Sequence, residues 1–175
     1  MPKPIFFKTF ILQILSLIIF TGLSTLSVAA TENDEAADPF APKEFIESPL
    51  DLPTQLPNEK NLRAFRTGPD TVLTFLLDTT SLKIGSDKVI RYVVVIKNSS
   101  GSSSIKYEGI RCDTFEYKPL GIVGIDNKWI ATPSSQWRII PNQGYNQYQA
   151  TLGRYGLCTG NSPNTNFKQA ILSLP

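Results

Sequence analysis

The stretch from Val89 to Lys97 has the clearest alternation of side chains in the chain. Successive side chains of a strand point to opposite faces of a sheet. One face of this stretch is fully apolar and the other is mixed, which predicts a β-strand packed on a core. A loop without apolar residues follows over 98–104, and the β pattern resumes from Ile105 to Cys112. The two strands are therefore predicted to form a hairpin.

The second strand of this hairpin contains an apparent change of phase. Ile105 and Tyr107 share one face, whereas Ile110 and Cys112 share the opposite face. A β-bulge at Gly109 would produce such a change, because an extra residue in one strand shifts the alternation. The pattern therefore predicts a bulge that turns Cys112 into the core.

Shorter apolar stretches predict the remaining strands. They lie at 70–78, at 115–117 with an end before Pro119, at 128–132 and at 136–140, and the last two carry Trp129 and Trp137. The period changes near residue 146, where Tyr148, Leu152 and Tyr155 recur at the spacing of one helical face.

We therefore predict a helix with Asn146 as its N-cap and Gly156 as its C-cap. The expected fold is α+β: an antiparallel sheet of five or six strands with one helix packed on it and one disulfide.

The first thirty residues have the order of a secretory signal. Lys3 and Lys8 precede an apolar stretch from Thr9 to Leu26, and small residues end in Ala30. We expect a signal peptide over 1–30 and export to the periplasm. The alternative is an uncleaved membrane anchor, since the apolar stretch is long enough to span a bilayer.

Composition changes again after the signal. Residues 31–61 are rich in proline and acidic residues, and we expect an extended or disordered leader there. The globular domain is then expected over 62–160, and 161–175 is expected to be a tail or a second short helix.

Export bears on the two cysteines, Cys112 and Cys158. An even number of cysteines in an exported chain implies that they pair. The alternative is two separate thiols, one of them reactive.

Charge and composition exclude several classes of function. The chain has 17 basic and 15 acidic residues; Lys3 and Lys8 lie in the signal, which has no acidic residue, so the remainder is balanced at 15 and 15. A neutral chain lacks the basic field of a nucleic-acid binder and does not dock on an anionic membrane. We therefore expect no nucleic-acid partner, and membrane attachment only through an uncleaved signal segment.

Histidine is absent from the sequence. This excludes Ser-His-Asp and Cys-His mechanisms and metal sites that need imidazole. Neither a phosphate-binding loop nor a dinucleotide-binding motif occurs, so no cofactor is expected.

A short block, Tyr107-Glu108-Gly109-Ile110-Arg111-Cys112, is the most specific string in the chain. With Arg91 to Val95, Trp129, Trp137 and Leu152 to Cys158, it resembles the cryptic neisserial protein-like (CNP-like) family of functionally uncharacterised exported proteobacterial proteins. The resemblance covers roughly 62–158. It implies a Gram-negative envelope location and a single domain with this cysteine pair, and it implies no activity.

Candidate site residues are the polar and aromatic side chains near this block: Glu108, Arg111, Glu116, Trp129, Trp137 and Arg138. Carboxylates such as Glu108 or Glu116 would suit a hydrolase of envelope glycans if two of them flanked one cleft. Aromatic rings with a polar rim would suit a small-ligand binder. The same residues also suit a sheet that packs its rings and pairs its charges. We therefore expect a non-enzymatic structural or interaction module whose partner is an envelope protein or glycan.

Overall fold

The protein is described by a computed structural model that covers residues 44–68, 71–141, 144 and 147–175. The expected signal segment and the start of the expected leader lie outside these residues. Within them, no helix has the length and apolar character needed to cross a membrane.

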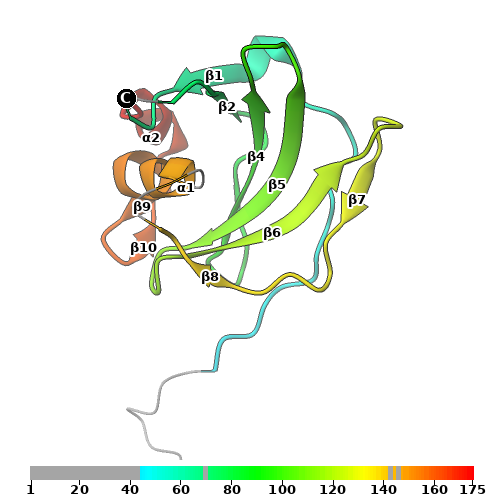
Figure 1. Cartoon of the computed structure of the whole chain (residues 1–175). Helices are drawn as coiled ribbons and strands as arrows, with labels where there is room; N and C mark the ends of the chain where they lie inside the picture. The colour runs from blue at the N-terminus through cyan, green and yellow to red at the C-terminus, as the bar shows by residue number, and fades with distance from the viewer. Residues whose placement is uncertain (1–43, 69–70, 142–143, 145–146) are drawn as a thin grey trace, which may run out of the picture. The chain divides into compact units, whose positions relative to one another are not determined.

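An antiparallel sheet dominates the part of the chain that is described (Figure 1). Its main path contains six strands in the order β1-β2-β4-β5-β6-β7, while β3 pairs with β4 and β8 pairs with β6. The strand bounds are β1 Leu62–Phe65, β2 Thr74–Asp78, β3 Lys83–Ile84, β4 Ile90–Lys97, β5 Ser103–Arg111, β6 Glu116–Val123, β7 Trp129–Ala131 and β8 Arg138–Ile139. A separate short ribbon joins β9 (Cys158–Thr159) to β10 (Ser162–Pro163).

Helical segments pack against one face of this sheet. They are α1 (Gln147–Leu152), a π-helical turn over Gly153–Leu157 that continues it, and α2 (Phe167–Leu172); a short 3-10 turn, Glu59–Asn61, precedes β1. The sheet, the helix and the disulfide confirm the predicted α+β fold. The second short helix is present, and Asn166 caps it by accepting a hydrogen bond from the Gln169 amide.

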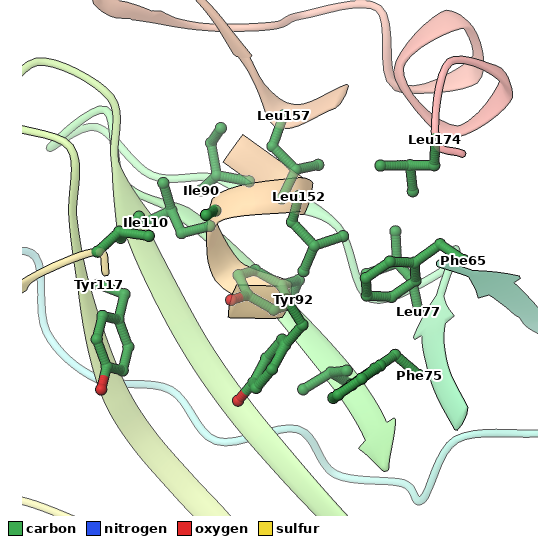
Figure 2. Packing of buried hydrophobic residues seen from close by; sticks show 14 of the residues in the cluster. Phe65, Phe75, Leu77, Ile90, Tyr92, Ile110, Tyr117, Leu152, Leu157 and Leu174 are labelled. Atoms are coloured by element: carbon green, nitrogen blue, oxygen red, sulfur yellow. The ribbon is translucent and has the colours of Figure 1, made fainter. Parts of the chain in front are cut away.

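Two apolar clusters cover the two faces of the sheet. The inner core lies between the sheet and the helical segments, and Figure 2 shows Tyr92 and Ile110 of the sheet beside Leu152 and Leu157. The outer core, on the other face, contains Val93, Tyr107 and Leu120 with Leu52, Ile105 and Trp129 packed against them. Strand β4 is central, so every residue from Ile90 to Ile96 is buried.

The predicted bulge at Gly109 is wrong. Strand β5 pairs with β4 without interruption from Ser103 to Ile110, so its alternation is regular. The phase appeared to change because Ile105 and Tyr107 face the outer core while Ile110 and Cys112 face the inner core. The register irregularity lies in β6 instead.

In β6, Pro119 and Gly121 pair with consecutive residues of β5, which leaves Leu120 as the extra residue. The strand therefore continues through Pro119 instead of ending before it. A proline is tolerated in a strand beside a bulge, where the hydrogen-bond ladder is already interrupted.

The helix also ends differently from its prediction. The helical segment continues to Leu157, and Gly156 lies inside it instead of capping it. The π-helical turn alters the period, so Leu157 is fully buried while Tyr155 is 59% exposed. A Cβ on Gly156 would lie 2.9 Å from the Ala170 carbonyl oxygen, so glycine here permits the close approach of α2. The predicted N-cap, Asn146, lies outside the described residues.

The predicted disulfide is confirmed. Cys112 at the end of β5 is bonded to Cys158, which follows the helical segment directly, and their Cα atoms are 5.6 Å apart. The bond therefore fixes the end of the helical segment to the sheet.

Loss of this disulfide is expected to destabilise the fold by about 2–4 kcal/mol, because the bond closes a long loop in the unfolded chain. Urea denaturation of the Cys112→Ser/Cys158→Ser variant measures this loss. A reductant should lower the wild-type midpoint and leave the variant unchanged. Equal midpoints for the oxidised wild type and the variant would contradict the assignment.

Candidate functional site

An extended segment, residues 44–58, crosses the outer face of the sheet before the chain enters β1 (Figure 1, cyan). We call it the N-terminal strap. It forms no strand of the sheet and is held by its side chains and by isolated hydrogen bonds. Within the leader expected over 31–61, residues 44–58 are extended and pack on the sheet, and Glu59–Asn61 forms a 3-10 turn.

The first anchor of the strap is Phe45. Its ring contacts the edge of the Trp137 ring with centroids 5.9 Å apart. The Arg111 guanidinium carbon lies 3.8 Å from the Phe45 ring centroid, so the charge sits over the ring face. Such cation–π contacts contribute about 0.5–2 kcal/mol, depending on burial.

Glu47 is the second anchor. Its Oε2 accepts a hydrogen bond from Lys118 Nζ at 2.7 Å and another from Trp137 Nε1 at 3.3 Å. Both partners of the ion pair are mostly buried, which strengthens the interaction relative to an exposed pair. Glu47 therefore joins the strap to β6 and to the segment that precedes β8.

The Arg111 guanidinium also binds two carboxylates, Asp113 at 3.0 Å and Glu116 at 3.4 Å. Partial burial alone would raise the pKa of Asp113, but Arg111 lowers it overall. The Arg111 guanidinium thus contacts two carboxylates and the Phe45 ring of the strap.

A third anchor is the backbone of Ser48. Its amide donates to Asp87 Oδ2 at 2.9 Å, and Asp87 receives both terminal nitrogens of Arg91 at 3.0 and 2.6 Å. Burial alone would raise the pKa of Asp87, but the hydrogen bonds from Arg91, Ser48 and Val89 lower it to about 2. Asp87 therefore stays ionised at all moderate pH values.

The far end of the strap contacts the outer core. Leu52 packs against this core, and Trp129 Nε1 donates to the Gln55 carbonyl at 3.1 Å. The Trp129 ring in turn meets Tyr107 edge-on at 6.1 Å.

Gly109 has a steric role in this face. An added Cβ would lie 2.9 Å from Val89 Cγ1 and 3.3 Å from the Trp137 ring. The absence of a side chain thus makes room for Trp137, which explains the glycine between Tyr107 and Arg111.

Glu108 lies on the opposite face of β5 and is only 1% exposed. Its carboxylate accepts hydrogen bonds from the hydroxyls of Tyr92 (2.9 Å) and Tyr148 (2.7 Å). Gln149 Nε2 lies 3.3–3.4 Å from both carboxylate oxygens. Because Tyr148 and Gln149 belong to α1, Glu108 fastens this helix to the sheet.

The environment of Glu108 controls its protonation. Burial raises its pKa above the ordinary value of 4.5, although the hydrogen bonds from Tyr148, Tyr92 and Gln149 and the charge of Lys106 oppose this. Burial also raises the pKa of Tyr92. Tyr92 therefore remains a hydrogen-bond donor to Glu108.

The structure separates the candidate residues into different places. Arg111, Glu116 and Trp137 gather near the start of the strap, and Trp129 lies at its far end. Arg138 is exposed on β8. Glu108 and Glu116 lie on opposite faces of the sheet, so they do not flank one cleft. No group of carboxylates and cysteines among the described residues is arranged to hold a metal ion.

Sequence reasoning missed Glu47 and the Asp87–Arg91 pair. The spacing of Asp87 and Arg91 offered a weak signal, but the residues join across a turn instead of along a helix. Glu47 gave no signal, because its partners Lys118 and Trp137 are far away in the sequence.

Two hollows lie beside the strap on the outer face, with volumes of about 390 and 310 Å³. They share Asp51, Lys83 and Tyr107. Their size falls at the lower end of the range for small-ligand sites.

Replacing the main strap anchor should loosen the strap. Phe45→Ala removes the ring contacts with Trp137 and Arg111, and we expect the free energy of unfolding to fall by about 1–2 kcal/mol. Tryptophan fluorescence should shift to longer wavelength, because Trp137 gains exposure. The neighbouring Ile46→Ala is the control, since Ile46 is 79% exposed. Equal effects of the two variants would show that the strap does not depend on Phe45.

The buried carboxyl of Glu108 should make the stability of the fold depend on pH. Its folded pKa lies above 4.5, so its contribution is complete below this value and declines as pH rises toward the folded pKa. The decline is at most about 1.4 kcal/mol per pH unit. Glu108→Gln should remove it, whereas Glu44→Gln on the exposed strap should not. The check is urea denaturation from pH 4 to 8; parallel curves for wild type and Glu108→Gln would refute the role of ionisation. The pKa values of Asp87 and Asp113 are lowered, so the fold also loses stability at low pH when these carboxyls become protonated. This loss is the same in the wild type and in both variants.

Comparison with known proteins gives one match. The CNP1-like family matches residues 40–175, a range that includes the strap, the sheet, the disulfide and both helices. No curated protein and no solved structure matches the chain. The chain belongs to the CNP1-like family.

Proposed function

We propose that this protein is an exported, non-enzymatic interaction module of the periplasm, and that it binds its partner at the outer face of the sheet beside the strap. The signal-like N-terminus and the envelope location implied by the family resemblance support export. A disulfide between Cys112 and Cys158 is also suited to an oxidising compartment.

The carboxylates that would serve a hydrolase are used within the fold. Glu108 is enclosed by two tyrosines and a glutamine, and Glu116 pairs with Arg111. A glycosidase places two carboxyl groups on either side of one bond. Opposite faces of a sheet do not provide that arrangement, and this favours binding over hydrolysis.

The observation that carries the proposal is the way the strap lies on the sheet. Phe45, Glu47 and Leu52 fix it in place, and hollows remain beside it with polar walls. Binding sites for small ligands are usually preformed hollows that combine an apolar surface with a few fixed polar groups.

Site-specific photo-crosslinking in a Gram-negative envelope tests this proposal. A photoreactive side chain at Leu56, which is 40% exposed and lines the larger hollow, should give a crosslinked species. The same group at Leu172, which is 63% exposed on α2, is the control and should give none. Crosslinks at neither position, or equally at both, would contradict a partner at this face. Release of new reducing ends from purified murein by the protein would contradict a non-enzymatic role.

A further inference from the structure

The two hollows beside the strap meet at a common wall. Asp51 of the strap, Lys83 of β3 and Tyr107 of β5 line both of them. Arg91 of β4 also lines the smaller hollow. Charged and polar groups from four separate segments thus converge on one groove between the strap and the sheet.

Arg91 is part of the wall of the groove. The Arg91 side chain is 8% exposed, and its terminal nitrogens bind Asp87. Its Nε has no hydrogen-bond partner among the described residues, but this atom is itself buried, so Arg91 shapes the wall of the smaller hollow and its Nε is not available to a ligand.

The Tyr107 hydroxyl makes no hydrogen bond to the described residues, although the residue is 5% exposed. Burial raises its pKa, so it stays protonated and can both donate and accept. Lys83 and Asp51 are exposed at the rim, and neither forms an ion pair within the described part of the chain.

The charges in the groove are balanced. Asp87 neutralises Arg91, which leaves Lys83 and Asp51 as one positive and one negative exposed group. The groove therefore has no net charge that would attract an anion or a cation. The remaining carboxylate, Asp78, is buried and accepts hydrogen bonds from Thr80.

A neutral ligand must instead offer both donors and acceptors at close spacing. Lys83 only donates, Asp51 only accepts, and the Tyr107 hydroxyl does both. Adjacent hydroxyl groups satisfy this mixture, since each hydroxyl can donate and accept.

The larger hollow is also lined by polar groups, and it adds an apolar surface. Gln55, Asn58 and Asn61 add side-chain amides, and Leu52 and Val93 add an apolar surface. A sugar ring has hydroxyls at its edge and C–H groups on its faces, so it matches polar walls with an apolar floor.

We propose that the groove between the strap and the sheet binds a neutral oligosaccharide, with Asp51, Lys83 and Tyr107 as its main polar contacts. This inference rests on the proposed function and names the chemical class of its partner.

Titration calorimetry with the exported, disulfide-bonded protein tests the inference. The neutral probes are chitotetraose, maltotetraose and cellotetraose, and the comparison ligands are anionic tetragalacturonate and zwitterionic tri-alanine. At least one neutral probe should bind saturably. Asp51→Asn, Lys83→Gln and Tyr107→Phe should each weaken it about five-fold, the usual effect of one lost hydrogen bond.

Asp126→Asn is the control, because Asp126 is an exposed carboxylate in the turn between β6 and β7. It should bind as the wild type does, and thermal unfolding should show that all four variants are folded. No binding of any neutral probe at millimolar concentration would overturn the inference. Preference for tetragalacturonate or tri-alanine, or variants that bind normally, would also overturn it. If a photoreactive group at Leu56 still crosslinks in such a case, binding of a partner at this face is supported, and only the neutral oligosaccharide is excluded as the ligand.

Discussion

Successive side chains of β5 point alternately into the inner core and toward the outer face of the sheet. Glu108, Ile110 and Cys112 face the helical segments, whereas Tyr107 and Arg111 face the strap. Residues Tyr107 to Ile110 of β5 are buried because both faces of the strand are covered there. The disulfide, the position of α1 and the first anchor of the strap all depend on this double burial, through Cys112, Glu108 and Arg111.

The two faces use polar groups in different ways. On the inner face, Glu108 is held by neutral donors, Tyr92 and Tyr148, which suit a carboxyl group whose pKa is raised by burial. On the outer face, Arg111 and Lys118 meet carboxylates near solvent, where ionised pairs persist. The inner network therefore fixes the fold, and the outer face retains charged and polar groups near solvent.

Local sequence patterns predict the sheet and the helix, because the alternation around β4 and the helical spacing of Tyr148 and Leu152 depend on near neighbours. The disulfide follows instead from the even number of cysteines in a chain that is expected to be exported. The helix end predicted at Gly156 is wrong because the chain continues as a π-helical turn. The bulge predicted at Gly109 is wrong because the outer face of β5 has a cover of its own, which nothing nearby in the sequence indicates. That cover is the strap, whose proline-rich composition resembles that of a disordered leader. The separation of Glu108 from Glu116 follows from strand register, which sequence alone leaves open.

In solution, the strap is expected to cover the outer face of the sheet. Nuclear Overhauser contacts measured by NMR on the exported protein test this arrangement. Contacts are expected between the rings of Phe45 and Trp137, and between Leu52 and the outer-core residues Val93 or Tyr107. Random-coil chemical shifts over 44–58, with no contacts from these side chains to the sheet, would contradict it.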